Sequence, residues 1–526
     1  NLYILEGKKC LHKLNGFFAF AIYDLQEKSL FIARDRTGIK PLYYMLDEDR
    51  LLFASEMKSI IAYGIEKTLD YSALYTYLQL NYIPAPATIF EKVKKLLPGH
   101  CIEVSPGKIN IEKYYEIPHE RNSYTSDTYE AQQKKLEKLL EKSVQHRLVA
   151  DVPLGSFLSG GVDSSVIATL AKRHKPDLHT FSIGYKDEKF FDETHYARAV
   201  AQKIGSEHTV FSLTNRDLYE KVNNILNYID EPFADSSAIA VYILSQETRR
   251  HATVALSGDG ADELFAGYNK HAAFLKVIRG GTTGDVIKHL QPLWAVLPRS
   301  RNNALTNTFR QLHRFSKGMK LSSRERYWQW AGYATESEVS KLLSAESREV
   351  LNLQQYDTLK SQWLSHIPSK ESINDLLYTD TLLVLPDDML TKVDRMSMAN
   401  SLEVRVPFLD HELVEYAFQL PVDSKINGKI RKRIIQDTFR NILPEELYNR
   451  PKKGFEVPLL KWFRREMSSL IRDDLLADSF VEQQGIFNVN EIRRLKRQLF
   501  SSNPGDVHAR IWALIVFQWW WKRYMT

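Results

Sequence analysis

The sequence predicts an α/β protein with more than one domain. Its 526 residues are enough for two or three separate hydrophobic cores. From 150 to about 260, short apolar runs alternate with amphipathic segments of helical period, which is typical of a parallel sheet with helices on both faces. From 270 to the end, long segments of helical period dominate, so we expect a helical C-terminal part.

The composition is that of a soluble globular protein, with 44% hydrophobic and 26% charged residues. No apolar run approaches the ~20 residues that cross a bilayer, and no signal-peptide pattern is present, so we expect a cytoplasmic protein without a membrane partner. The formal charge of +6 is small and scattered, and we expect no nucleic-acid partner. The chain has only two cysteines, Cys10 and Cys101, which are far apart in sequence, so a thiolate zinc site is excluded. We interpret both as packing residues.

The first elements have the pattern of an antiparallel sheet. Residues 16–24 and 30–34 are apolar or alternating and are separated by a short polar stretch, which predicts a hairpin. Residues 51–58 are expected to close this sheet and to begin a helix. We interpret 81–118 as a connector with a hairpin-like stretch, followed by a polar linker near 118–128.

The alternating region follows a predicted helix at 129–148 that is rich in Glu and Lys. Strands are expected at 152–158, 178–185, 207–213 and 253–257. Helices are expected near 165–173, 193–204, 215–229 and 237–251. In such sheets, ligands bind at the carboxyl ends of the strands. The role of 280–380 stays open; the region could shape a substrate pocket or a partner surface.

The most informative segment is Ser-Gly-Gly-Val-Asp-Ser-Ser at 159–165, between an apolar run and a helix start. Backbone N–H groups converge on an anion at such a turn. Gly160 and Gly161 allow close approach to a phosphate, and Ser159, Ser164 and Ser165 add hydroxyl donors. Asp163 would repel a bare phosphate, so its position makes sense if Mg2+ lies between them. The alternative is an ordinary glycine-rich turn, but a Walker loop is excluded because no Gly-Lys-Ser/Thr follows.

A second loop of similar composition follows the fourth strand, with the sequence Leu-Ser-Gly-Asp-Gly-Ala-Asp-Glu. Its three carboxylates, Asp259, Asp262 and Glu263, lie within five positions and would repel one another unless a cation shares the space. Asp163 of the first loop could converge on the same point. A solvated acidic turn is the alternative interpretation.

Two further segments carry charge in unusual places. The block 385–410 places charged residues among apolar ones, either as a structural ion-pair network or in a substrate role. These residues are Asp394, Arg395, Glu403, Arg405 and Asp410. The basic run 429–433 stands at the start of a predicted helix. By itself, such a charged run usually forms a solvent-exposed face. A basic turn at 450–455 is a candidate for closing over the site.

Together these segments resemble one known family. The run 159–165 matches the SGGxDS signature of the PP-loop ATP pyrophosphatases, and nearly the whole chain is similar to the asparagine synthetase family of glutamine-dependent amidotransferases. The resemblance implies the C-terminal portion of an α/β/β/α N-terminal-nucleophile (class II) glutaminase domain at 1–118. It also implies a PP-loop synthetase domain with a helical C-terminal part at 129–526.

The family nucleophile is a cysteine at the mature N-terminus, whose own α-amino group is the base. The first residue here is Asn1, and Cys10 cannot replace that cysteine because its nitrogen is an amide. We therefore expect an N-terminally truncated chain that uses free ammonia, while the intact protein takes nitrogen from glutamine. A naturally ammonia-using enzyme is the rival interpretation.

The resemblance implies ATP and Mg2+, cleavage of ATP between the α and β phosphates, and an acyl-adenylate of aspartate that ammonia converts to asparagine. The implied partners are the small molecules aspartate, ammonia or glutamine, and ATP, with a homodimer possible. One alternative is an amidotransferase acting on another carboxylate, such as a sugar acid in surface polysaccharide or natural-product biosynthesis. A nucleotide-sensing protein without catalysis is the third hypothesis, and the retained acidic and basic residues argue against it.

The resemblance also implies roles for individual residues. ATP binding falls to Leu158, Ser159, Gly160, Gly161, Asp163, Ser164, Ser165, Ile183, Ser257 and Gly258. Asp163 and Asp262 are the implied metal ligands, and Asp259 and Lys432 the implied catalytic residues. The implied acceptor pocket comprises Glu263, Tyr268, Arg395, Glu403 and Arg405.

Overall fold

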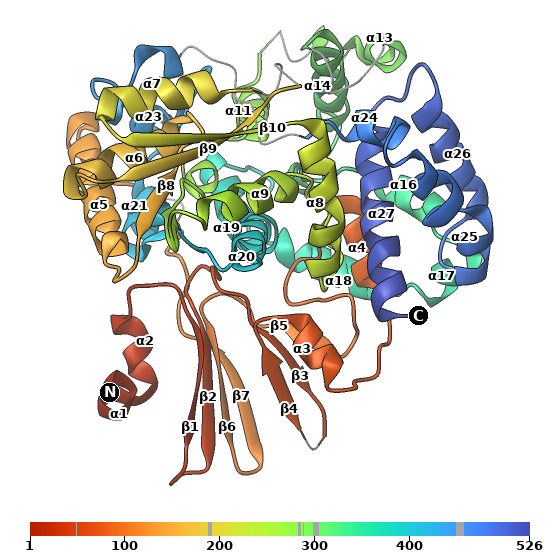
Figure 1. Ribbon diagram of the computed structural model, residues 1–526, viewed down its shortest axis with the longest axis horizontal. Coiled ribbons are helices and arrows are strands. Elements are labelled where there is room, and N and C mark those ends of the chain that lie inside the picture. Colours follow the sequence, from red (N-terminus) through yellow and green to blue (C-terminus); the bar gives the residue numbers. More distant parts are fainter. Residues whose placement is uncertain are drawn as a thin grey trace.

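The computed structural model describes residues 1–48, 50–120, 123–187, 192–281, 286–287, 289–297, 304–448 and 457–526. Most of the first 118 residues form a smaller part that lies below a larger α/β part (Figure 1). The predicted fold class is confirmed: antiparallel sheets come first, followed by a parallel sheet and a mainly helical C-terminal region. No helix in the described ranges is both long and apolar enough to cross a membrane.

The N-terminal part contains two antiparallel sheets, in the orders β1-β2-β6-β7 and β4-β3-β5. Their strands are β1 (Ala19–Asp24), β2 (Ser29–Arg34), β3 (Tyr43–Leu46), β4 (Leu51–Ala54), β5 (Val93–Lys95), β6 (His100–Ser105) and β7 (Lys108–Lys113). Its helices are α1 (Leu2–Glu6), α2 (Cys10–Lys13) and α3 (Met57–Ala62). The helix α4 (Tyr71–Leu80) of the same stretch of chain lies among the helices of the larger part (Figure 1).

The expectations of a single sheet and of a connector at 81–118 were wrong. β5 pairs with β3, and the β6–β7 hairpin pairs through β6 with β2, so the supposed connector completes both sheets. The pairing joins residues far apart in the chain, and β5 has only three residues. Such a short strand has too few positions to show a period of two.

The larger part is built on a five-stranded parallel sheet in the order β10-β9-β8-β11-β12. The strands are β8 (Leu154–Phe157), β9 (His179–Tyr185), β10 (Glu207–Leu213), β11 (Val254–Leu256) and β12 (Glu403–Arg405). Four of them lie within the predicted ranges, whereas β12 was not predicted. With two charged residues in three, β12 lacks the apolar pattern of a buried strand.

Helices cover both faces of this sheet, as expected (Figure 1). Their bounds are α5 (Tyr129–Leu148), α6 (Val162–His174), α7 (Thr194–Ile204), α8 (Asn215–Tyr228) and α9 (Ala238–Thr248). The helices α9 and α20 (Thr391–Met398) pack apolar side chains on one face, around Phe157 and Phe181. The helix α7 packs against α6 on the other face.

The remaining described helices form the C-terminal region. They are α10 (Ala261–Leu264), α11 (Asn269–Arg279), α13 (Gln291–Val296), α14 (Ala304–Gly318), α15 (Ser323–Ala331), α16 (Glu336–Leu342), α17 (Ala345–Val350), α18 (Leu353–Trp363), α19 (Ile373–Val384), α21 (His411–Gln419), α22 (Val422–Lys425), α23 (Arg433–Phe439), α24 (Leu459–Arg464), α25 (Asp478–Gln484), α26 (Val489–Phe500) and α27 (Val507–Tyr524). Trp520 of α27 packs against Phe90 and donates to the carbonyl of Asp230, which ties the C-terminus to both parts.

The two parts meet through the charged block 385–410. Lys40 of the N-terminal part pairs with Asp394, with 2.7 Å between Nζ and Oδ1. Arg395 donates to Asp230 at 2.7 Å and to the hydroxyl of Tyr43 at 2.8 Å. These contacts show that part of the block forms the ion-pair network that the sequence left open.

The same block closes a second contact between the parts. Asp410 accepts hydrogen bonds from Arg147 and, at 3.0 Å, from the amide of Asn15. Arg147 also donates to the Asn15 side-chain oxygen at 3.0 Å. Each of these buried charges therefore has a partner, as buried charges require.

The variant Arg395→Ala is expected to lower the free energy of unfolding by about 3 kcal/mol, because it leaves the Asp230 carboxylate buried and unpaired. Lys142→Ala is the control, since Lys142 pairs with Glu412 in solvent and should cost under ~1 kcal/mol. Urea unfolding followed by tryptophan fluorescence measures both. Equal losses in the two variants would show that the Arg395 pair adds nothing beyond a surface contact.

Candidate active site

The two glycine-bearing loops lie together at one edge of the parallel sheet. They follow β8 and β11, which are neighbours in the sheet, so both leave it at the carboxyl edge. A Cβ added at Gly258 would lie 2.8 Å from the backbone nitrogen of Ser164 and 3.0 Å from the Cβ of Asp163. Only glycine allows the second loop to approach the first this closely.

The first loop is organised by its own serines. The N–H of Ser159 donates to Ser164 Oγ at 3.2 Å, and the two hydroxyl oxygens are 3.0 Å apart. The N–H of Gly161 donates to Ser159 Oγ at 3.2 Å. The helix α6 begins directly afterwards without a side-chain cap, and Gly160 has a φ of +76°. An uncapped helix N-terminus behind a glycine turn is a suitable place for a phosphate group.

The other predicted nucleotide residues of this half lie at the same edge. Leu158 is buried, and its N–H donates to the carbonyl of Phe181 on β9 at 2.8 Å. Ile183 is also on β9 and is 7% exposed. The hydroxyl of Ser165 is buried and has no hydrogen-bond partner among the described residues. Packing explains the side chains of Leu158 and Ile183 equally well, so their nucleotide role stays a prediction.

Lys432 joins the two loops from a third segment. Its ammonium group contacts Asp163 of the first loop and lies 2.6 Å from Asp262 Oδ1 of the second. The N–H of Lys432 donates to the carbonyl of Phe265 at 3.1 Å, and its φ of +51° places it in the left-handed region. Burial alone would lower the pKa of Lys432, but the two carboxylates outweigh burial and raise that pKa. The side chain is therefore a buried, permanently charged cation at the convergence of the loops.

A divalent cation fits the same carboxylates. Among the residues that the structure describes, no group of three or more His, Cys, Asp or Glu side chains could hold a metal by itself. Mg2+, however, is commonly held by one or two carboxylates together with substrate phosphates. Oδ1 of Asp163 is buried and has no hydrogen-bond partner in the described part of the chain, so it could serve such an ion. The donor set of Asp163 and Asp262 therefore fits Mg2+ bound together with a phosphate.

Asp259 lies inside the second loop. Burial raises the pKa of its carboxyl group, against the opposing effects of a hydrogen bond from Ser257 and the charge of Lys392. The N–H of Ser257 donates at 2.8 Å to the carbonyl of Arg405 on β12, which anchors the start of the loop to the sheet. Sequence reasoning did not identify Lys392 as a neighbour of Asp259, because Lys392 lies on α20, far along the chain.

Glu263 and Tyr268, two residues predicted for the acceptor pocket, contact each other, and their role in that pocket stays a prediction. The Tyr268 hydroxyl donates to Glu263 Oε1. Burial, and then the charge of Asp262, raise the pKa of Glu263 to about 7, although the bond from Tyr268 lowers it. Glu263 is thus a carboxyl group that changes charge near neutral pH.

A buried cluster supports Tyr268. The N–H of Tyr268 donates to His271 Nδ1 at 3.3 Å, and His271 Nε2 is 2.7 Å from Asp380 Oδ2. Since Nδ1 accepts, Nε2 carries the proton and donates to Asp380. Lys270, at 2.6 Å, and the Tyr327 hydroxyl also donate to Asp380, which is fully buried. Sequence reasoning missed this cluster; its signal was Asp380, one of two aspartates within the largely apolar α19.

The other residues predicted for the acceptor pocket have ion-pair partners of their own. Arg395 lies at the contact between the two parts of the molecule, bonded to Asp230. Glu403 and Arg405 pair with each other on β12 at 2.7 Å, and Arg405 also donates to the carbonyls of Arg147 and Val149. A role of these three side chains in the acceptor pocket stays a prediction. The basic turn at 450–455 lies outside the described residues.

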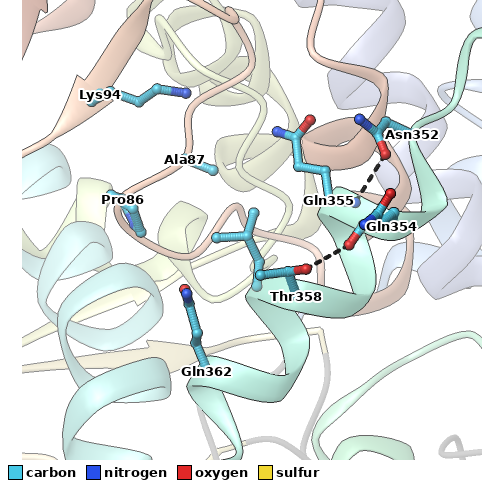
Figure 2. Close-up of a pocket in the computed structure, with 9 residues that line it drawn as sticks. Pro86, Ala87, Lys94, Asn352, Gln354, Gln355, Thr358 and Gln362 are labelled. Carbon is cyan, nitrogen blue, oxygen red and sulfur yellow. Dashed lines mark hydrogen bonds between the residues drawn. The ribbon is translucent and has the colours of Figure 1, made fainter.

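A separate cavity of about 370 Å³ includes none of the predicted site residues (Figure 2). It lies between the segment 86–94 and α18, and Asn352, Gln354, Gln355 and Gln362 supply amide groups to its lining. Its polar groups are partly used within α18: the Gln355 N–H donates to Asn352, and the Thr358 hydroxyl donates to the carbonyl of Gln354.

Comparison with known proteins gives the family of this chain. A family model described as asparagine synthase matches residues 135–522, and a glutamine amidotransferase domain matches residues 1–115. The chain belongs to the asparagine synthase family. Membership confirms the sequence-based identification of an ATP-dependent ligase coupled to a glutamine amidotransferase domain.

Curated relatives align over most of their length. The glutamine-hydrolysing asparagine synthetase 1 of Bacillus subtilis (strain 168) is 33% identical over 530 residues, which cover 98% of this chain and 79% of the relative. Synthetase 3 of the same organism is 29% identical over 86% of this chain and 69% of its own length. Amidase chyE of Penicillium rubens is 24% identical over 95% of this chain and 78% of its own.

A solved structure, the glutamine-dependent NAD+ synthetase of Acinetobacter baumannii with ADP, overlaps only weakly. It matches with a TM-score of 0.19 and 12% identity, over 50% of this chain and 64% of that one. This likeness carries no argument about the fold.

The variant Gly258→Ala is expected to weaken the binding of Mg-ATP at least tenfold, which corresponds to about 1.4 kcal/mol. The new Cβ would press on Ser164 and Asp163 and push the loops apart. Gly16→Ala is the matched control, because its Cβ meets nothing within 4 Å. Isothermal titration calorimetry measures both, and unchanged affinity in Gly258→Ala would contradict a shared nucleotide site.

Proposed function

We propose that the protein amidates the side chain of aspartate to give asparagine, with ATP cleaved to AMP and pyrophosphate. The observation that carries the proposal is the contact of Lys432 with one carboxylate from each glycine-bearing loop. Family membership supports the same reaction. We assign residues 129–526 to this synthetase and residues 1–118 to the C-terminal portion of a glutaminase domain.

In the first step, an oxygen of the aspartate side chain attacks the α phosphorus, and the bond to the bridging oxygen of the β phosphate breaks. The loop at 159–165 and the N-terminus of α6 would hold the phosphates through backbone N–H groups. The Lys432 ammonium group lies where negative charge develops on the transferring phosphoryl oxygens. A Mg2+ ion held by Asp163 and Asp262 would neutralise charge on the departing pyrophosphate.

In the second step, ammonia attacks the activated carbonyl carbon, the bond to AMP breaks, and the nitrogen loses a proton. Asp259 is the candidate to accept that proton, since burial raises its pKa toward the range useful for a base. Nitrogen would come from glutamine in the intact protein and from free ammonia in this chain. We propose that Glu263, held by Tyr268, pairs with the α-ammonium group of the acceptor.

Purified protein supplied with aspartate, ammonium and Mg-ATP is expected to release pyrophosphate and AMP in step with asparagine. Asp163→Asn should reduce this rate at least a hundredfold, because Lys432 loses a charged partner and the proposed Mg2+ site loses a carboxylate ligand. Asp177→Asn is the control, since Asp177 is an exposed residue at the far end of α6. Turnover of a uronic acid but not aspartate would transfer the proposal to a sugar-acid acceptor. Nucleotide binding without pyrophosphate release would refute amidation of either acceptor, aspartate or sugar acid.

Tyr268→Phe is expected to move the pH dependence of kcat/KM for aspartate to higher pH by about one unit. The Tyr268 hydroxyl stabilises the ionised Glu263 carboxylate, so its loss raises a pKa that is already about 7. Only ionised Glu263 attracts the substrate ammonium group, and activity should therefore rise with pH through this pKa. Rate measurements from pH 5.5 to 9 check the shift, with Tyr23→Phe, an exposed tyrosine, as control. An unshifted profile would show that Glu263 does not bind the ammonium group of the acceptor.

A further inference from the structure

A second cavity, of about 340 Å³, lies in the region 280–380 whose role the sequence left open. Its walls come from α14, α15, α16 and the start of α27, and include none of the residues predicted for catalysis or nucleotide binding. The helix α14 presents Arg310, His313, Arg314 and Lys317 to it. Arg310 is three and four positions before His313 and Arg314, and Lys317 is four and three positions after them, so the four side chains lie on one face of the helix. Arg510 of α27 lines the same cavity.

The cavity has an excess of positive charge. Four arginine and lysine side chains line it against two carboxylates. Glu338 lies 3.2 Å from Arg510, and Asp506 lies 3.5 Å from Arg310. Lys317 has no ion-pair partner within the ranges that the structure describes, so its charge is available to a ligand. A concave surface of one sign concentrates counter-ions.

One of the arginines is held in place by backbone. Nη2 of Arg314 donates to the carbonyls of Gln329, Trp330 and Gly332, at 2.8 to 3.2 Å. These three carbonyl acceptors fix the orientation of the guanidinium group. A fixed, planar guanidinium group is well suited to recognising phosphate oxygens.

Hydrogen-bond acceptors in the cavity wall point to a ligand with donors. Gln329 Oε1 and Asp506 Oδ1 are buried and have no hydrogen-bond partner among the described residues. Buried polar atoms normally have one. Hydroxyl groups of a ligand would satisfy both acceptors, while the basic side chains bind its negative charge.

We propose that this cavity binds a small phosphate monoester that carries hydroxyl groups, of the sugar-phosphate class. The volume lies at the lower end of the range for small-molecule sites. Basic side chains account for the phosphate, and the unpartnered oxygens of Gln329 and Asp506 for the hydroxyl groups. The proposal does not depend on the amidation reaction, because the two sites share no residue.

Calorimetry of the full chain with ribose 5-phosphate, inorganic phosphate and ribose tests the proposal. Ribose 5-phosphate is expected to bind with one site per chain, phosphate more weakly, and ribose not measurably. Lys317→Ala should weaken ribose 5-phosphate binding about tenfold, or about 1.4 kcal/mol. Lys320→Ala is the matched control, since Lys320 is an exposed lysine just beyond α14 that does not line the cavity.

A second variant distinguishes recognition of the hydroxyl groups from recognition of the phosphate group. Gln329→Leu removes an acceptor and should weaken ribose 5-phosphate binding about fivefold while leaving phosphate affinity unchanged. Absence of binding to the unaltered protein would overturn the proposal. Equal losses in Lys317→Ala and Lys320→Ala would also overturn it, because they would show non-specific attraction to a basic protein.

Discussion

The ammonium group of Lys432 connects segments that are remote in sequence. It is buried between Asp163 and Asp262. One cation therefore balances two carboxylates, one from each loop, whose like charges would otherwise lie side by side. Neither aspartate could approach the other without this cation, because unscreened carboxylates repel strongly away from water. The positions of the glycine turns, of α6 and of the second loop all follow from this arrangement.

The same physical rule operates at the contact between the two parts of the molecule. Charges of the block 385–410 are neutralised by Lys40, Asp230 and Arg147, so the contact is specific as well as buried. Trp520 adds an apolar contact that reaches both parts. Paired charges of this kind lock one relative placement of the parts, since any shift would leave a charge without its partner.

Glu263 shows how a distant helix can influence a site without touching a ligand. Asp380 on α19 orients His271, which accepts from the backbone of Tyr268, whose hydroxyl in turn bonds to Glu263. Each link is a hydrogen bond between buried or partly buried groups, so the chain holds the carboxyl group in one orientation. The helix α15 contributes Tyr327 to Asp380 and Gln329 to the basic cavity, so it contacts both regions.

The sequence by itself determined the parallel sheet, most of its helices and the two loops, because apolar period and glycine turns are local properties. It also identified Asp163, Asp262 and Lys432 as site candidates, through their motifs and the family resemblance. Only the tertiary structure decided that β5 pairs with β3 and β6 with β2. It also decided that β12 is the fifth strand of the parallel sheet and that Asp380 is buried among its donors. Strand pairing and charge compensation depend on residues that are far apart in the chain, and no local pattern records which of them meet. For the same reason, no local pattern could show that Arg395 pairs with Asp230.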